Sequence, residues 1–501
     1  MTTAYAVVIP TIGRPSLHRL LAALKDATGP QPAAVVIVDD RPAAEQPLTL
    51  PDTDFPVKVL RSGGRGPAAA RNVGWRSTDA DWICFLDDDV VPGPNWYAEL
   101  ASDLREARGS VVGSQGTITV PVPREHGNPR RPTDDERRTL GLATAQWITA
   151  DMAYRRSALV SCGGFDERFP RAYREDADIA LRLTQAGGRI IQGARQTEHP
   201  VPVGRPSVLS SVRAQRGNRD DALMRRKHGR RWRPAIGEGR GRLRIHVLTT
   251  GAALTALAAA GARLPRAAII AALSWLGLTV EFTLRRIAAG PRTAREVIAM
   301  ALTSVLIPPV AVAQRLWGTW LFRAAPAEPP LAVLLDRDDT LIEDGPYLND
   351  PAGVVPMPTA QRALGRLRKH GLLLAVVTNQ SGVAKGLISP EQLDAVNLRV
   401  DELLGPFDCW QVCVHDGGCS CRKPAPGMVF AAADALSVDT RHCVMIGDTG
   451  GDVAAAHAAN AAAILVPTDS TLPGEITAAH ANSQVAASLD DAVSLVLKGF
   501  R

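Results

Sequence analysis

Aromatic residues are scarce in this sequence, where Phe, Trp and Tyr together make up 5% of 501 residues. Its 46% hydrophobic and 22% charged residues are nevertheless typical of a folded globular protein and exclude wholesale disorder. The N-terminus lacks a charged segment followed by a long apolar run, so we expect no signal peptide and a cytoplasmic protein. No internal repeat is visible, and at roughly 100 to 200 residues per domain the length predicts two to four units.

Cysteine is sparse and unevenly placed. Of the seven cysteines, Cys84 and Cys162 stand alone, whereas four fall between residues 409 and 421. This distribution excludes an evenly spaced disulfide framework and favours a metal site in a reducing compartment.

The net charge is also small, at +6, but basic residues are concentrated in residues 213–233. Such a run can face nucleic acid, anionic lipid or sugar phosphates, or can simply be a solvated helix face. Trp232 is the one aromatic residue within it and no nucleic-acid-binding motif accompanies it, so we expect no nucleic-acid partner.

Long hydrophobic runs occur only between residues 245 and 322, as three Ala-rich segments separated by arginine-bearing loops. Each approaches the roughly 20 residues that span a bilayer. Two interpretations stay open: membrane contact, with 245–262 and 267–284 as a hairpin, or a buried helical connector. The third segment is expected to be broken at Pro308-Pro309 and, in the membrane interpretation, to lie at the membrane–water interface.

The organisation that follows is an α/β protein with four parts. Short apolar runs at 4–10, 34–38 and 82–86 alternate with helix-like stretches and predict a parallel α/β sheet. A second α/β pattern has strands near 331–335, 373–377 and 443–446. The expected parts are 1–240, an apolar helical connector at 241–323, a Pro/Ala linker at 324–330, and 331–501.

Acidic residues follow the third N-terminal strand in the segment FLDDDVVP, which contains Asp87, Asp88 and Asp89. Carboxylates at a strand end can hold a divalent cation that bridges the phosphates of a nucleotide-sugar. The glycine-rich SGGRGP is no P-loop, because it lacks the GK[ST] ending. Cys84 and Trp82, on the strand itself, are expected to be core residues.

Four further segments follow in order around this one: VIPTIGRP, VDDRP, GPAAARNVGW and GGFDERFPRAYREDADIALRL. Together they resemble the family 2 glycosyltransferases of the GT-A fold over residues 4–235. The resemblance implies donor contacts and a Mg²⁺ or Mn²⁺ ion. It implies base or ribose contact by Asp39, substrate contacts by Arg71 and Asp87, and metal binding by Asp89 and His199.

The same resemblance identifies Asp176 as the general base that takes the proton of the acceptor hydroxyl. Glu175 and Asp178, in the same segment, remain alternatives for the base. The acceptor is expected to be a saccharide or a lipid-linked molecule.

The strand LAVLL near residue 335 ends in Asp336, Arg337, Asp338 and Asp339. Two carboxylates at this spacing can divide the work of phosphoryl transfer, one attacking phosphorus and one handling the proton of the leaving oxygen. Together with Thr378, Lys423 and Asp448, which follow in order, they resemble the haloacid dehalogenase superfamily of phosphatases.

This second resemblance implies that Asp336 is the nucleophile and Asp338 the general acid/base. Thr378, Asn379 and Lys423 would contact phosphate, and Asp448 would complete Mg²⁺ coordination with Asp336 and the carbonyl of Asp338. Asp339 stands where the superfamily usually has glycine. If that position needs φ > 0, aspartate tolerates it better than most residues.

The cysteine cluster forms a C-x-H-x3-C-x-C pattern of Cys413, His415, Cys419 and Cys421, which predicts a structural Zn²⁺ site. Cys409 is left over, and Cys443 is expected in the core. The zinc pattern beside Arg422, a further phosphate contact, resembles the histidinol-phosphate and heptose-bisphosphate phosphatase branch over residues 331–470. The interval between the histidine and the next cysteine is short for that branch.

The resulting hypothesis is a bifunctional enzyme that transfers a sugar from a nucleotide-sugar and hydrolyses a sugar phosphate. The first substrate candidate is D-glycero-D-manno-heptose 1,7-bisphosphate, with histidinol phosphate or another small phosphate as alternatives. A rival hypothesis makes the second domain a non-catalytic sugar-phosphate sensor, and Asp339 is the feature that favours it.

Overall fold

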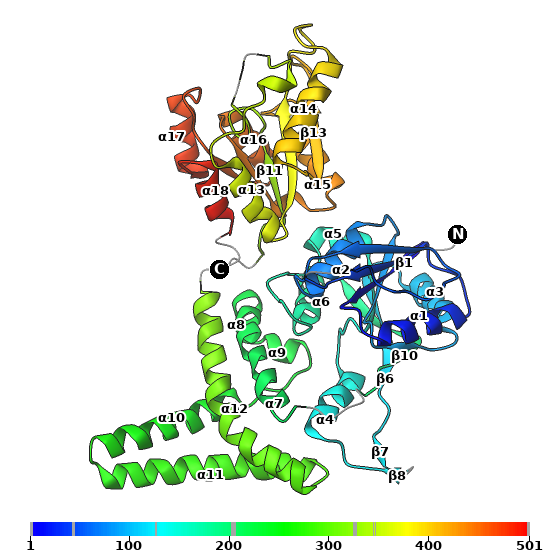
Figure 1. The fold of residues 1–501 in the computed structure, drawn as a ribbon, viewed down its shortest axis with the longest axis vertical. Helices are drawn as coiled ribbons and strands as arrows, with labels where there is room; N and C mark the ends of the chain where they lie inside the picture. The colour runs from blue at the N-terminus through cyan, green and yellow to red at the C-terminus, as the bar shows by residue number, and fades with distance from the viewer. Residues whose placement is uncertain are drawn as a thin grey trace. The chain divides into compact units, whose positions relative to one another are not determined.

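The chain forms two units in a computed structural model that describes residues 4–42, 46–125, 128–201, 207–323, 328–343, 345 and 347–497 (Figure 1). The first unit comprises Met1–Ala158 and Phe165–Arg323. The second comprises Ala324–Arg501 together with Leu159–Gly164. Residues 324–327 of the expected linker lie outside the described residues.

An eight-stranded sheet organises the first unit, in the order β3-β2-β1-β4-β9-β6-β10-β5. β1 runs parallel to β2 and β4, while β9 and β5 run antiparallel, so the expected parallel sheet is in fact mixed. The strands are β1 (Tyr5–Thr11), β2 (Ala34–Asp39), β3 (Val57–Arg61), β4 (Trp82–Leu86), β5 (Val91–Pro92), β6 (Val111–Thr119), β9 (Asp151–Arg155) and β10 (Arg189–Glu198).

Apolar spacing explains how helices cover this sheet. In α1 (Ser16–Asp26) the buried residues Leu17, Leu20, Leu21 and Leu24 recur at three- and four-residue intervals and pack against β1 and β2. Trp82 and Cys84 are buried in the same core, as predicted. The other helices considered below are α2 (Pro67–Arg76), α3 (Trp96–Glu106), α4 (Asp134–Leu140), α6 (Glu175–Gln185), α7 (Ser210–Arg213), α8 (Gly217–His228) and α9 (Trp232–Ala235).

The apolar segments form three long helices within the first unit: α10 (Leu243–Gly261), α11 (Pro265–Ala289) and α12 (Ala294–Leu321). All three are long and apolar enough to cross a membrane. The expected break at Pro308-Pro309 is wrong, because α12 continues through both prolines. The buried packing of Ile307, Pro308 and Ala311 offsets the hydrogen bonds that proline cannot donate.

A parallel six-stranded sheet forms the second unit, in the order β13-β12-β11-β14-β15-β16. Alternate residues of β11 point to two apolar cores, Val333 and Leu335 to one and Ala332 and Leu334 to the other. The strands are β11 (Ala332–Leu335), β12 (Leu373–Asn379), β13 (Cys409–Cys413), β14 (Cys443–Gly447), β15 (Ala462–Leu465) and β16 (Gln484–Val485).

Helices cover both faces of this sheet, which is therefore doubly wound. They are α13 (Ala360–Lys369), α14 (Pro390–Leu404), α15 (Gly427–Ala435), α16 (Gly450–Ala458), α17 (Pro473–Asn482) and α18 (Leu489–Leu497). The strand order reverses at β11, between β12 and β14, and ligands bind at the carboxyl ends of strands at such a switch point.

Candidate functional sites

The first unit has a cavity of about 600 Å³ at the carboxyl ends of β1, β2 and β4. Acidic residues dominate its polar lining. Five residues predicted from the sequence line it: Arg71, Asp87, Asp89, Asp176 and His199.

Asp39, the sixth predicted residue of this site, is not among the lining residues. Its carboxylate is 2% exposed and accepts hydrogen bonds from the Arg41 guanidinium at 2.6 and 2.8 Å. The neighbouring Asp40 does line the cavity, held by the Ser62 hydroxyl at 2.7 Å and by the backbone N–H of Gly66. The role of Asp39 as a base or ribose contact stays a prediction.

Arg71 connects two acids of the cavity wall. Its guanidinium is buried and donates to Asp87 at 2.7 Å and to Glu175 at 2.9 Å. Burial works to lower the pKa of Arg71, but Asp87 and Glu175 outweigh it and the pKa is raised. Glu175 also lines the cavity; burial, with Asp176 beside it, raises its pKa, and Arg71 opposes that rise.

Asp178 lies outside the cavity lining and is fully paired. It accepts from Lys227, Arg182 and His228 at 2.8 to 2.9 Å. Burial would raise its pKa, yet Lys227 and Arg182 hold the pKa well below its usual value. Lys227 comes from the basic run at 213–233, so part of that run is buried structural charge rather than free surface.

Asp176 has a different environment at the start of α6. It lines the cavity, and its carboxylate accepts the backbone N–H of Ala177 at 2.7 Å. Burial raises its pKa. A cavity-facing carboxylate with a raised pKa is suited to taking up a proton.

Asp89 and His199 are neighbours in the lining of the cavity, with the His199 Nε2 3.6 Å from the Asp89 Oδ1. Arg14 donates to Asp88 and Asp89, and the Thr11 hydroxyl donates to Asp88 at 2.6 Å. Burial raises the pKa of Asp89, with Asp87 adding to it. A carboxylate and an imidazole at this separation are donors that fit a divalent cation.

In the second unit, the predicted residues meet at the switch point. Asp336 follows β11, Thr378 lies at the end of β12, and Asp448 follows β14. The sheet is parallel, so these strand ends lie at one edge. The fold therefore brings these predicted residues together at one edge of the sheet.

Lys423 lies at the centre of this site and is buried. Its ammonium contacts Asp336 at 2.8 Å and Asp452 at 2.6 Å, and donates to the carbonyl of Val377 at 2.9 Å. Burial raises the pKa of Asp336 well above its usual value, and Lys423 opposes that rise. Asn379 exchanges hydrogen bonds with the backbone of Lys423, so it holds the loop that carries the ammonium.

Asp338 is held by two neighbours. Arg337 donates to one carboxylate oxygen at 2.8 Å, and Gln380 donates to the other at 2.6 Å. Gln380 also donates to the Thr378 hydroxyl at 3.0 Å, and Arg337 is anchored by Asn397. The sequence singled out neither Gln380 nor Asn397; the adjoining TNQSG segment was the available signal for Gln380.

Three carboxylates in this site are placed to share a cation. Ligand oxygens of Asp336, Asp448 and Asp452 lie within 4.8 Å of one another, and all three residues are buried. Burial raises the pKa of Asp448 to about 7, with Asp452 and Asp339 adding to it. Three carboxylates this close together repel one another, and Mg²⁺, which prefers oxygen ligands, would relieve that repulsion. The sequence predicted Asp336 and Asp448 as ligands of this ion, and the structure places Asp452 beside them.

Asp339 has φ +53°, so the position does require the left-handed conformation that glycine favours. Its carboxylate accepts the Ser470 hydroxyl at 2.9 Å. The adjacent Thr471 donates to the carbonyl of Asp448 at 2.6 Å. One loop thus contacts both the nucleophile segment and a predicted metal ligand.

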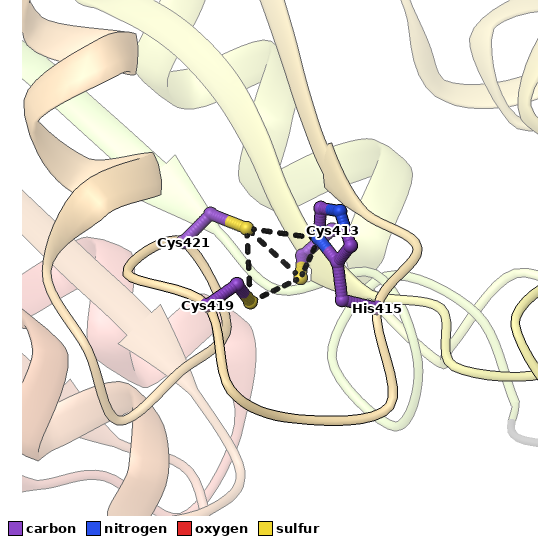
Figure 2. A group of neighbouring side chains, drawn as sticks. All are labelled: Cys413, His415, Cys419 and Cys421. Atoms are coloured by element: carbon purple, nitrogen blue, oxygen red, sulfur yellow. Dashed lines mark hydrogen bonds between the residues drawn. The ribbon is translucent and has the colours of Figure 1, made fainter.

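The cysteine cluster closes around a single point (Figure 2). Cys421 Sγ lies 3.2 Å from Cys413 Sγ and 3.2 Å from Cys419 Sγ, and His415 Nδ1 lies 3.3 Å from Cys421 Sγ. With Zn–S bonds of about 2.3 Å, a tetrahedral site has S–S edges of about 3.8 Å, so the donors fit zinc after a small expansion.

The hydrogen bond from Cys421 lowers the pKa of the Cys419 thiol, while burial and the neighbouring thiols raise the pKa of Cys421. Cys409 lies outside the cluster, beside Gln411, and Cys443 is buried in β14. Arg422 donates to the carbonyl of His415, so the cluster positions the predicted phosphate contact.

Known proteins resemble the two units separately. Models described as glycosyl transferase family 2 and HAD-hydrolase-like match residues 6–162 and 420–492. A D-glycero-beta-D-manno-heptose-1,7-bisphosphate 7-phosphatase of Pseudomonas aeruginosa is 35% identical over 143 residues, covering 27% of this chain and 80% of that protein. The protein of that name from Vibrio cholerae is 36% identical over 141 residues, covering 26% and 76%.

Among solved structures, a D,D-heptose 1,7-bisphosphate phosphatase from B. bronchiseptica, complexed with magnesium and phosphate, is 30% identical to this chain. The match covers 33% of this chain and 98% of that chain, with a TM-score of 0.30.

Proposed function

The chain belongs to the haloacid dehalogenase phosphatases through its second unit and carries a family 2 glycosyltransferase domain in its first, and we propose that it catalyses both reactions. The observation that supports this most directly is a complete reactive set in each unit. Asp336 lies beside Lys423 in one, and Asp176 lines the acidic cavity of the other.

For the phosphatase, Asp336 attacks phosphorus and forms an aspartyl-phosphate as the leaving oxygen departs. Asp338 donates a proton to that oxygen and then takes a proton from the water that hydrolyses the intermediate. Lys423 and Thr378 hold the phosphate oxygens, and Arg422 binds a more distant phosphate. Mg²⁺, held by Asp336, Asp448 and the Asp338 carbonyl, would neutralise charge on the transferring group, with Asp452 close by.

The proposed substrate is a heptose 1,7-bisphosphate, because two phosphatases of that name are 35% and 36% identical to this chain and the match covers most of their length. Histidinol phosphate or another small phosphate is the alternative. The zinc cluster would stiffen the loop that presents Arg422 and Lys423 to the substrate.

For the transferase, Asp176 takes the proton of the acceptor hydroxyl. Its two rivals are engaged elsewhere, Glu175 with Arg71 and Asp178 with Lys227. Asp87 and Arg71 contact the donor, and Asp89 with His199 would hold Mg²⁺ or Mn²⁺ on its diphosphate. The donor is a nucleotide-sugar and the acceptor a saccharide or lipid-linked molecule.

We place both reactions in the cytoplasm, at the inner face of the cell membrane, in the assembly of a cell-surface polysaccharide or glycoconjugate. One reaction would prepare an activated sugar and the other would transfer one.

The test is phosphate release by the purified full chain from heptose 1,7-bisphosphate, histidinol phosphate and common sugar phosphates, with Mg²⁺. Asp336→Asn removes the nucleophile, and Asp394→Asn, on the exposed surface of α14, is the matched control. Turnover of the heptose bisphosphate that only Asp336→Asn abolishes supports the proposal. Folded, zinc-loaded protein that binds these substrates and turns over none would assign the second unit a regulatory role instead.

A further inference from the structure

Two helices of the first unit present apolar side chains to their surroundings. In α10, Val247, Leu248, Leu254 and Leu257 are 50 to 72% exposed. In α11, Ile270 and Leu273 are 66% and 62% exposed. Only 17% of the most apolar stretch of α10 and 11% of that of α11 is buried. Apolar surface of this extent is costly in water and marks an interaction site.

The two helices lie side by side as an antiparallel hairpin (Figure 1). At 1.5 Å per residue, the 19 residues of α10 extend about 28 Å, close to the roughly 30 Å of a bilayer's hydrocarbon core. Between Arg266 and Glu281, α11 contains no charged residue, and between Arg244 and Arg263 the only titratable residue is His246.

α12 differs from the hairpin, because it is built into the transferase unit. Gly318 packs so closely on α8 that an added Cβ would lie 2.4 Å from the Arg219 carbonyl oxygen. In α12, 39% of the most apolar stretch is buried. This contact holds the third helix against the unit, although Leu302, Leu316 and Trp320 of α12 are exposed too. α10 and α11 are the less buried pair.

Charged residues collect at both ends of the hairpin. At the end near the transferase unit, Arg242 pairs with Glu281 at 2.7 Å. Arg286 there donates to Thr303 of α12 at 2.7 Å and to Ser211 at 3.0 Å, and it pairs with Asp134. Arg263 and Arg266 occupy the turn at the other end. This distribution matches a bilayer, with an apolar centre and anionic headgroups on both sides.

We propose that α10 and α11 insert as a hairpin into a lipid bilayer that contains anionic lipid, and that the contacts of Arg286 and Gly318 hold the transferase unit at its surface. A hairpin returns the chain to its starting side, so both catalytic units stay on one face. A second copy of the chain is the less favoured occupant, because it would have to cover the exposed apolar side chains of both helices, and because Arg263 and Arg266 at the turn are exposed cations that match an anionic surface. The inference concerns location and is independent of both proposed reactions.

The test is flotation of the full chain with vesicles of phosphatidylcholine, with and without phosphatidylglycerol. The double variant Leu257→Asp/Ile270→Asp places a charge on each helix, and Leu398→Asp, at a 62% exposed leucine of α14, is the matched control. We expect the wild type and the control to float, more completely with the anionic lipid. We expect the double variant to bind about tenfold or more weakly, because each aspartate would carry a charge into the hydrocarbon.

Folding of every variant is checked by circular dichroism and thermal melting. Two results would overturn the proposal. One is wild-type protein that stays unbound with both vesicles and forms a dimer that the double variant converts to monomer. The other is equal loss of flotation in Leu398→Asp, which would reveal nonspecific adhesion.

Discussion

The ammonium of Lys423 lies 2.6 Å from Asp452 and 2.8 Å from Asp336, so one buried cation is shared between the predicted nucleophile and a second carboxylate. Asp452 also accepts the backbone N–H and hydroxyl of Thr449, which fixes its position at the start of α16. It is thereby a positioning residue for Lys423 as well as a neighbour of the predicted metal ligands.

Replacing Asp452 by alanine is expected to lower phosphatase kcat by roughly ten- to a hundredfold, because Lys423 loses its anchor and metal affinity falls. Asp452→Asn keeps the Thr449 contacts and should recover part of the loss. Steady-state kinetics over a Mg²⁺ series measures both. Equal kinetics for the alanine variant and wild type would contradict the role.

Asp176→Asn is expected to lower transferase kcat by about 10² to 10⁴, because the acceptor proton loses its base. Donor binding, measured by calorimetry with the nucleotide-sugar, should remain. Asp178→Asn would not serve as a control, since Asp178 is paired to Lys227. Phosphate release reports on the second unit alone, so retained donor binding is the check that the first unit of the variant is folded.

Acid should destabilise the transferase unit through Asp178. Its folded pKa is depressed, so its contribution is fully present above the unfolded value of about 3.9 and is lost as pH falls through the folded pKa. Thermal unfolding between pH 7 and pH 3 should show stability falling below about pH 4. Asp178→Asn should be less stable at pH 7 by about 3 kcal/mol or more and show a flatter acid limb.

We predict that the cysteine cluster binds zinc and that removing this metal destabilises the second unit. We expect Cys421→Ser to lose bound zinc and to lower the melting temperature, whereas Cys409→Ser, which lies outside the cluster, should retain both. Metal content by mass spectrometry and calorimetric melting measure this. Full zinc content in Cys421→Ser would show that the other three ligands suffice.

The left-handed backbone of Asp339 predicts a difference between two small substitutions. Asp339→Ala should be less stable than Asp339→Gly by about 1 kcal/mol, because alanine at positive φ is strained. Both variants lose the Ser470 contact, so the comparison isolates the backbone. Urea unfolding measures it, and equal stabilities would mean that the loop relaxes.

The sequence by itself determined that the chain carries a glycosyltransferase domain and a phosphatase domain, and it predicted reactive residues that the fold brings together in each. Carboxylates directly after buried apolar strands, such as Asp87 and Asp336, must emerge at a sheet edge, because strand ends of a parallel sheet lie together. The cysteine and histidine spacing likewise predicted a cluster that the fold brings to one point. Local pattern is sufficient for such features because they depend on neighbours in the chain.

Only the tertiary structure decided which acids are free and which are paired. Glu175, Asp176 and Asp178 are close in sequence, yet Arg71 and Lys227 reach two of them from distant segments. The same holds for Asp452 with Lys423, and for α12, where burial against α8 outweighs the two prolines. Partners that come from distant segments leave no pattern in the local sequence. The distribution of charge in the two sites could therefore be derived only from the tertiary structure.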